Sequence, residues 1–418
     1  MAINYNNTFL HKLGTAIFVL GPILSWYEIS FPVPLGYTMI LFVSFFALLK
    51  NNFNIRVLPK PFWIVFIYIC FLWVYNNGFA LWTLLPPGGW VFFIFALSLI
   101  GGVQAFDINT AIKYMKIIVW IAIVLFWIQL ISLIITGTNN FCFVPHLTNH
   151  FSYGNLSYEE MTALHHSSKH PCSIFIEKSY MAYYLLAYLC FLFFEAHKEK
   201  WFDKESIALM VTLIALRSGS GMVGLVVLLV AKAFQLMWKG SLGRRIMMII
   251  AMVPLSLAAF WVYQSTEVGQ EMISRTSEFS TENSSGYTRV IAGYMTYDML
   301  TTSEKIIGTP DAVERFGIER NDGGVASGLI LYLNGIQSIL VGAGLLGLLL
   351  YVLFYTSIYK MVSLGSRMQI ILLLVMALLE SNYLNPYMML LTIIPCAEYY
   401  HRRINAQDFD ISHNEIEV

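Results

Sequence analysis

The stretch Leu213–Val230, LIALRSGSGMVGLVVLLV, places Arg217 inside an otherwise apolar segment. An arginine within a membrane helix costs roughly 2.5–3.5 kcal/mol unless it reaches water or a partner. The Ser-Gly-Ser-Gly run that follows can open a new helix, whose first N–H groups and dipole favour phosphate. Arginine adds a planar fork that can hold a diphosphate at two points. Arg217, Ser218 and Ser220 are therefore candidates for phosphate binding. The alternative is an interfacial arginine that reaches lipid headgroups.

A second arginine, Arg289, stands in SSGYTRVIAGYMTYDML among aromatic and apolar residues at helical spacing. This spacing predicts a helical face packed on a membrane domain, with Arg289 directed toward a cavity shared with Arg217. An ordinary surface helix with one arginine is the alternative. Arg275 and Arg315 lie in charge-rich parts of the same region, where arginines are usually solvated. They are kept as further candidates for substrate binding.

A carboxylate, Glu177, stands where a hydrophilic stretch meets the next apolar one, in HHSSKHPCSIFIEKSYMAYYLLAY. Partial burial raises the pKa of a carboxylate, which can then act as a general base toward a sugar hydroxyl. Tyr180, Tyr183 and Tyr184 can stack on sugar rings, although aromatic residues at this depth also form the ordinary interfacial belt. His170 is a further candidate for substrate binding. The alternative for Glu177 is an acid that complements the dipole at a helix start.

The motifs of metal and nucleotide sites are missing from the sequence. His146 and His150, and likewise His166 and His170, share a four-residue spacing but lack the surrounding pattern of a zinc site. There is no HExxH, no glycine-rich phosphate loop and no acidic pair of the kind found in nucleotide-sugar enzymes. We therefore expect no metal and no cofactor, and we expect any glycosyl donor to be lipid-linked.

The composition indicates the kind of protein that must position these residues. Of 418 residues, 57% are hydrophobic and 12% are charged, whereas soluble proteins carry about 25% charged residues. Apolar runs recur along the whole chain, which predicts an all-α polytopic membrane protein with a single transmembrane domain, 1–418. About twelve transmembrane helices are expected. They are placed at 13–28, 32–49, 61–77, 89–105, 117–136, 179–195, 206–217, 219–238, 246–264, 338–358, 368–381 and 384–400.

The distribution of positive charge predicts the orientation. With the N-terminus inside, roughly two thirds of the 25 Lys and Arg residues fall on the cytoplasmic side. Both termini are then cytoplasmic, and two long extracytoplasmic loops, 137–178 and 265–337, face outward. The second loop ends in ASGLILYLNGI, which predicts a helix lying at the outer interface. In the first loop, Cys142 and Cys172 can pair if that side is oxidising.

The order of these motifs resembles the O-antigen polymerase and ligase superfamily of bacterial inner-membrane proteins. The resemblance rests on a glutamate before a span in FIEKSYMAYYLL, a short span ending in LRSGSGMVGL, and the SGYTR arginine of a long outer loop. IIGTP and the amphipathic SGLILYLNGI follow, before the last group of spans. The resemblance covers residues 165–360. Each motif is short, so their order is what gives the comparison its specificity.

This resemblance implies a GT-C-like enzyme on the outer face of the inner membrane. Such an enzyme transfers a glycan from undecaprenyl diphosphate to an acceptor sugar without a metal. The resemblance assigns Arg217 and Arg289 to the donor diphosphate and Glu177 to a family glutamate. The expected partners are the undecaprenyl-diphosphate-linked oligosaccharide and the lipid bilayer, with a chain-length regulator protein as a further candidate and no nucleic acid.

Two alternatives to a repeat-unit polymerase stay open. O-antigen ligases usually carry a histidine just before the segment that matches SGLILYLNGI, whereas GGVASGL has none. This difference favours an O-antigen or capsule polymerase over a ligase. A transporter or flippase of lipid-linked sugars belongs to a different class. It more often shows inverted repeats and charges near the bilayer midplane, and the sequence has no convincing repeat.

Overall fold

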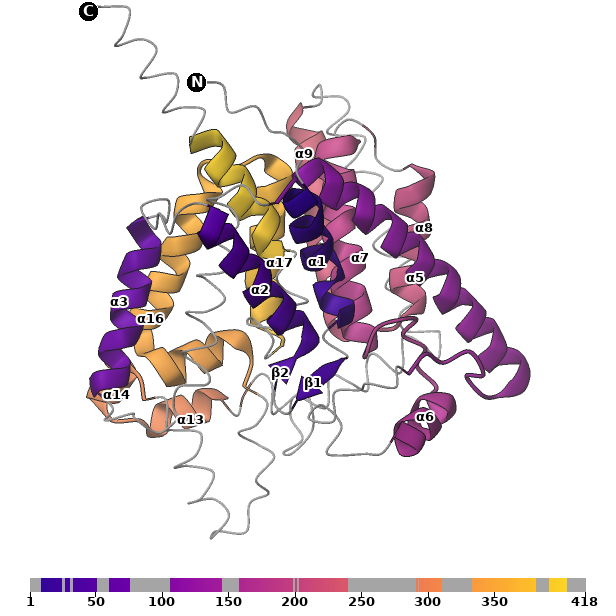
Figure 1. Cartoon of the computed structure of the whole chain (residues 1–418), viewed down its shortest axis with the longest axis horizontal. Helices are drawn as coiled ribbons and strands as arrows, with labels where there is room; N and C mark the ends of the chain where they lie inside the picture. Colours follow the sequence, from indigo (N-terminus) through magenta and orange to yellow (C-terminus); the bar gives the residue numbers. More distant parts are fainter. Residues whose placement is uncertain are drawn as a thin grey trace, which may run out of the picture.

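The computed structural model describes residues 9–24, 27–30, 33–50, 60–75, 106–144, 158–197, 200, 203–239, 291, 293–309, 333–380 and 391–403. Within these ranges the chain forms a helical bundle with one short pair of strands (Figure 1). The elements of the first part are α1 (Phe9–Leu24), β1 (Glu28–Ser30), β2 (Val33–Pro34), α2 (Leu35–Lys50), α3 (Lys60–Tyr75) and α5 (Ile108–Thr136). Those of the second part are α6 (Tyr158–Ser167), α7 (Lys178–Phe191), the π-helical segment η4 (Leu192–Ala196), α8 (Lys204–Ala215), α9 (Gly219–Lys239), α13 (Gly293–Met299), α14 (Thr302–Ile307), α16 (Gly335–Tyr359) and α17 (Leu364–Ala377). Residues 391–403 are also helical.

Helices that can cross a membrane are present, as the composition predicts. By length and composition, four are long and apolar enough: Ile108–Thr136, Lys178–Ala196, Gly219–Trp238 and Gly335–Tyr359. The predicted spans at 89–105 and 246–264 lie outside the described residues. Each of the others coincides with a helix over at least part of its length. The described residues are thus all-α in outline, with several helices long and apolar enough to span a membrane, and the total of about twelve spans stays a prediction.

The start of α5 differs from the prediction. The apolar run indicated a span at 117–136, but the helix begins at Ile108, where the Asp107 carboxylate accepts a hydrogen bond from the Thr110 N–H at 2.9 Å. This N-cap fixes the start nine residues earlier than the apolar run suggests. A 29-residue helix is about 44 Å long, whereas the hydrocarbon core measures about 30 Å. The first turns of α5 therefore extend beyond the apolar layer unless the helix is tilted.

One feature departs from a purely helical fold. β1 and β2 form an antiparallel pair in the short link between α1 and α2, with Glu28 opposite Pro34 and Ser30 opposite Val33. The chain folds back on itself here, and the pairing satisfies backbone groups that a helix would otherwise satisfy. The apolar periodicity of the flanking helices gives no sign of so short a pair.

The centre of the bundle is α7. Every side chain from Met181 to Cys190 is buried, and a helix that is apolar all round belongs in an interior. Its three buried tyrosines therefore need partners for their hydroxyls. Tyr183 donates to the Ser220 hydroxyl of α9 (3.0 Å), Tyr184 to the Val19 carbonyl of α1 (3.0 Å), and Tyr188 to the Glu205 carboxylate of α8 (3.1 Å). These three bonds orient three neighbouring helices around α7.

The two ends of the bundle differ in what they carry. In Figure 1, α6, α13 and α14 lie with the β1–β2 pair at the lower end, which we call the loop end. Residues 391–403 lie at the upper end, which we call the opposite end. The helical parts of both predicted long loops are thus on one side of the bundle, as the orientation argument requires.

Buried Lys232 stabilises the opposite end. Lys232 lies inside α9, within the predicted span 219–238, and is 0% exposed. Its ammonium donates to the carbonyls of Phe193 (2.5 Å) and His197 (2.9 Å). A cation at this position satisfies carbonyl groups at the end of η4 and complements the helix dipole.

α16 is broken near its start. Gly344 has φ 66° and ψ −174°, so the helix consists of two pieces, residues 335–343 and 345–359. The first piece runs across the loop end and the second along the bundle (Figure 1). The interfacial helix was predicted at 326–336, mostly outside the described residues. The observed helix begins at Gly335, after Asn334 accepts a hydrogen bond from the Gln337 N–H at 2.9 Å.

The break in α16 is packed against the IIGTP stretch. Gly308 of that stretch has φ 94°, and a Cβ on either Gly308 or Gly344 would lie 2.4–2.5 Å from backbone atoms of the other segment. The Tyr68 hydroxyl of α3 lies 2.6 Å from the Ile307 carbonyl and 2.8 Å from the Ala343 carbonyl. Two glycines and one tyrosine thus join α3, α14 and α16.

Replacing Gly344 with alanine should destabilise the protein. The new Cβ meets the backbone of the Gly308 segment and occupies a strained φ, which together cost about 2 kcal/mol. The measurement is the thermal melting temperature of the purified protein in detergent. Gly342→Ala is the matched control because a Cβ there meets nothing within 4 Å. Equal melting of the two variants would contradict the packing at the break.

Candidate functional site

Arg217 occupies a sharp turn between two helices. α8 ends at Ala215 and α9 begins at Gly219, as predicted from the Ser-Gly cluster. Arg217 has φ 50°, in the left-handed region, and its side chain is exposed. A residue with a side chain pays about 1–2 kcal/mol for this conformation. Such strain persists where the surroundings dictate it, often at a functional position.

The serines beside Arg217 hold the turn together. The buried Ser218 hydroxyl accepts a hydrogen bond from the Gly221 N–H at 3.3 Å and lies 3.4 Å from the Ser220 hydroxyl. Ser218 therefore caps the start of α9 itself and satisfies one of the N–H groups that were expected to face a phosphate. Gly221 has a packing role, because a Cβ there would lie 2.6 Å from the Ala182 Cβ of α7. Phosphate binding by Ser218 and Ser220 stays a prediction.

A buried polar cluster lies behind this turn. The Tyr183 hydroxyl of α7 donates to Ser220 at 3.0 Å and also interacts with the Glu380 carboxylate at the end of α17. Glu380 is 6% exposed. A buried carboxylate is costly unless hydrogen-bonding groups surround it, and the Tyr183 hydroxyl is such a group. We call Tyr183, Ser218, Ser220 and Glu380 the loop-end cluster.

The loop-end cluster joins segments that are far apart in the sequence. The Glu380 carbonyl accepts a hydrogen bond from the Gly335 N–H at 2.9 Å, at the start of α16. Residues of α7, of the turn after Arg217 and of the start of α16 therefore meet at one place. Glu380 was missed in the sequence analysis, where it fell at the end of a predicted span. The signal that could have identified it is a single acid at the end of the apolar run ILLLVMALLE.

A cavity of about 570 Å³ lies beside the start of α7. His170 and Glu177, two predicted site residues, both line it, together with Lys169, Lys178 and His165. Its volume is within the range of small-molecule sites. Glu177 and Tyr183 are six residues apart on one helix, which is about 9 Å along its axis. The cavity and the loop-end cluster are therefore neighbours at the same end of α7.

Glu177 itself is exposed. It stands at the N-cap position of α7, and the Ser179 hydroxyl donates to its carboxylate at 3.3 Å. Glu177 was predicted to be partly buried, as a general base requires, but the described residues leave it exposed. Its position fits the alternative role, an acid that complements the dipole of α7.

The cysteines and one histidine near the cavity are affected by burial. Burial, with the charge of Glu177 as a second cause, raises the pKa of the Cys172 thiol to about 12. Burial also raises the pKa of the Cys142 thiol and lowers the pKa of His165. Cys142 and Cys172 are both free thiols in the structure, so the pairing left open by the sequence is not formed.

The predicted sugar-stacking tyrosines have different environments. Tyr183 and Tyr184 are 0% and 1% exposed, so neither ring can stack on a sugar, and this expectation was wrong. Their hydroxyls bind neighbouring helices instead, because α7 is central. Tyr180 is partly exposed, with its ring 6.5 Å from that of Tyr183. It is the tyrosine of the three that can contact a ligand.

Three predicted arginines, Arg275, Arg289 and Arg315, lie outside the described residues. That Arg217 and Arg289 face one shared cavity therefore stays a prediction. The nearest described residue after Arg289 is Ile291, shortly before α13. Among the described residues, no three His, Cys, Asp or Glu side chains are grouped as a metal site requires.

Replacing Arg217 with glycine should relieve the strain of the turn. Glycine adopts a positive φ without steric cost, so Arg217→Gly should be more stable than Arg217→Ala by about 1 kcal/mol. Both variants lack the guanidinium, so the comparison isolates the backbone. The measurement is thermal melting of both variants in detergent. A lower melting temperature for the glycine variant would mean that the left-handed turn is not the native conformation.

No family model matches this chain, and no curated protein gives a significant match. Its function therefore has to be argued from its own residues. They combine an exposed arginine at a strained turn, a buried polar cluster behind it, and a cavity with two lysines and a glutamate, all at the same end of a bundle whose helices can span a membrane.

Proposed function

We propose that this protein is a metal-independent glycosyltransferase that polymerises polysaccharide repeat units. It takes a glycan from undecaprenyl diphosphate and adds it to a lipid-linked acceptor sugar, at the outer face of a bacterial inner membrane. The observation that carries the proposal is Arg217, an exposed arginine in a left-handed turn at one end of a membrane helix bundle. The motif order of the O-antigen polymerase and ligase superfamily supports it.

The proposed reaction needs a stabilised leaving group. The acceptor hydroxyl attacks the anomeric carbon, the bond from that carbon to the diphosphate breaks, and the hydroxyl proton passes to a base. Arg217 and Arg289 hold the departing diphosphate, whose negative charge grows in the transition state. Arginine suits this role because its fork binds phosphate oxygens in pairs. No metal is required for that step.

The neighbouring residues take supporting roles in this proposal. Glu177 and His170 line the cavity beside α7, where Glu177 receives the proton and His170 contacts the acceptor. Tyr180, which is partly exposed and packs beside Tyr183, stacks on a sugar ring. Arg275 and Arg315 bind substrate from the second long loop. A chain-length regulator protein is a candidate partner within the membrane.

A transporter or flippase is less well supported. Such proteins usually carry polar or charged groups near the bilayer midplane. α16 has no ionisable residue except tyrosine between Gly335 and Tyr359, and α7 has none except tyrosine and Cys190 between Ser179 and Phe191. The polar groups of α17 lie toward its start, and the buried cation of α9, Lys232, lies in the half of that helix nearer the opposite end. A reaction at one membrane face fits this distribution better than passage through the bundle.

Replacing Arg217 or Arg289 with alanine should abolish chain extension. Loss of one oxyanion-stabilising donor lowers a rate about 100- to 1000-fold. Purified protein is incubated with synthetic lipid-linked repeat units, and product length is read by gel or mass spectrometry. Lys305→Ala is the matched control, because Lys305 is a loop-end cation whose ammonium lies 3.9 Å from the Asp298 carboxylate. The rate of chain extension by this variant should stay within about twofold of the wild-type rate.

The products separate the proposed function from its alternatives. A ladder of repeats on the carrier lipid supports a polymerase. Transfer to a different acceptor indicates a ligase, and movement of substrate across vesicles without a new bond indicates a transporter. Full-length glycan from both arginine variants would refute the assignment of the site.

A further inference from the structure

A second cavity, of about 440 Å³, lies at the opposite end of the bundle. Four elements line it: the start of α5, the end of α7 with η4, the start of α17, and the helix of residues 391–403. It shares no lining residue with the cavity beside Glu177. The proposed glycosyl transfer does not use it. The distribution of Lys and Arg predicts that this end faces the cytoplasm.

The wall of this cavity includes an unsatisfied acceptor, the Gln369 side-chain oxygen. Gln369 of α17 is 2% exposed, and its Nε2 donates to the Ala187 carbonyl at 3.4 Å. Its Oε1 is buried and accepts no hydrogen bond from the residues that the structure describes. Buried polar atoms nearly always have a partner. A ligand that turns the Gln369 amide into the cavity and donates a hydrogen bond would supply one here.

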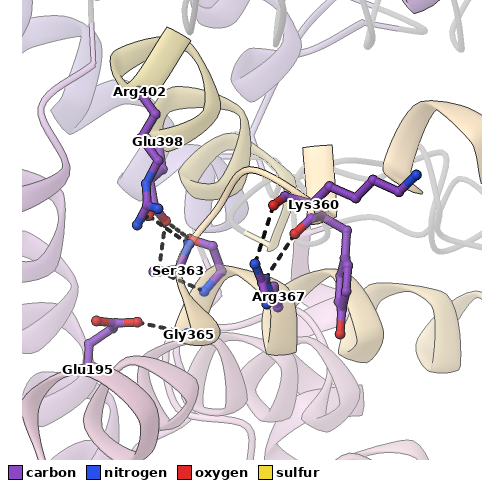
Figure 2. Close-up of polar contacts among 9 residues, drawn as sticks. Glu195, Lys360, Ser363, Gly365, Arg367, Glu398 and Arg402 are labelled. Atoms are coloured by element: carbon purple, nitrogen blue, oxygen red, sulfur yellow. Dashed lines mark hydrogen bonds and ion pairs between the residues drawn. The ribbon is translucent and has the colours of Figure 1, made fainter. Parts of the chain in front are cut away.

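Carboxylates dominate the polar part of the lining. Glu195 and Glu398 reach the start of α17 from two different helices (Figure 2). The Glu195 Oε1 accepts a hydrogen bond from the Gly365 N–H at 2.8 Å, and Glu398 accepts from the Ser363 N–H at 2.8 Å. Asp107, the N-cap of α5, is the third acid of the lining. Each carboxylate offers about four lone-pair positions. Those of Glu398 are filled by the Ser363 N–H, the Arg402 guanidinium and the hydroxyls of Ser363 and Ser366, so Glu398 contributes its charge, while Asp107 and Glu195 are the acids that can accept a further bond.

The cavity therefore has a negative formal charge. Its three carboxylates face one guanidinium, that of Arg402, which donates to Glu398 at 2.6 Å, so the lining carries −2 when His401 is neutral. Burial lowers the pKa of His401, although the charges of Asp107 and Glu398 act in the opposite direction. A donor-rich cation is the ligand that such a lining complements.

The chemistry of the lining distinguishes an organic cation from a metal ion. Within the described ranges, no three acidic, His or Cys side chains are grouped to hold a metal. Apolar side chains also line the cavity, among them Ile112, Met115, Phe191 and Ile394. An alkyl stem fits these side chains while an ammonium group reaches the carboxylates and the Gln369 oxygen. We propose that this cavity binds an alkylamine cation of the polyamine class.

The position of Glu195 suggests what such binding would do. Glu195 lies in the π-helical segment η4, an irregularity that is frequent at functional positions. Its bond to Gly365 joins α7 to α17 at the opposite end, and the interaction of Tyr183 with Glu380 joins the same two helices at the loop end. A cation that draws the Glu195 carboxylate into the cavity competes with the first of these contacts. Occupancy of the cavity is then coupled to the loop-end cluster through two rigid helices.

Calorimetry with spermidine tests the proposal on the purified full-length protein. Wild-type protein should bind spermidine, and a neutral diol of similar length should not bind. Glu195→Gln keeps an oxygen for the Gly365 N–H but removes the charge, and Gln369→Leu removes the unsatisfied acceptor at similar volume. Each variant should weaken spermidine binding about tenfold or more, the loss expected for one charge-assisted or buried hydrogen bond.

Glu205→Gln is the matched control, because its partly buried carboxylate binds Lys116, Trp120 and Tyr188 outside this cavity. Its affinity for spermidine should equal that of the wild type. Thermal melting without ligand shows whether each variant folds. If either Glu195→Gln or Gln369→Leu fails to fold, the other variant still decides the test. Absence of spermidine binding to the wild type would overturn the proposal. Equal binding of spermidine by all variants would overturn it too, and so would displacement of spermidine by Mg²⁺ at the same concentration. The assay needs no glycan, so its result is independent of the proposed transferase activity.

Discussion

The burial of α7 is the constraint on which the rest of the bundle depends. Its side chains from Met181 to Cys190 are enclosed on every side, so its apolar surface is removed from both lipid and water. Three tyrosine hydroxyls on this helix must still find partners, since an unsatisfied buried hydroxyl costs roughly 1–3 kcal/mol. They find them on α9, α1 and α8. Packing thus brings the helices together, and the hydroxyls determine how they are oriented.

The same helix connects the two polar regions of the protein. Near its start, Tyr183 links the turn after Arg217 to Glu380, just beyond the end of α17. Beyond its end, Glu195 binds the first turn of α17 through Gly365. α7 and α17 are therefore held together at both ends by polar contacts and between them by apolar packing. A pair of helices joined in this way can transmit a shift at one end to the other, because a close-packed interior yields little.

Sequence reasoning was most accurate where local signals were strong. The break at Arg217 and the helix starting at Gly219 follow from small residues that interrupt an apolar run. It was less accurate where distant contacts decide the backbone. Gly344 breaks α16 because Gly308 and Tyr68 pack against it, and nothing within GAGLLGLLL shows that contact. The early start of α5 had a local signal, the Asp107 cap, which the search for apolar runs did not weigh.

The sequence by itself determined the class of protein, since a chain with so few charges and so many long apolar runs can satisfy its backbone in a membrane as helices. It also supplied candidates for phosphate binding and proton transfer, by residue type and position. Only the tertiary structure decided which of them face a cavity. Tyr183 and Tyr184 differ from Tyr180 in burial although all three share one motif, and Glu380 acquires its partner from a helix nearly two hundred residues earlier. Burial depends on contacts between distant segments, and local residue patterns do not specify them.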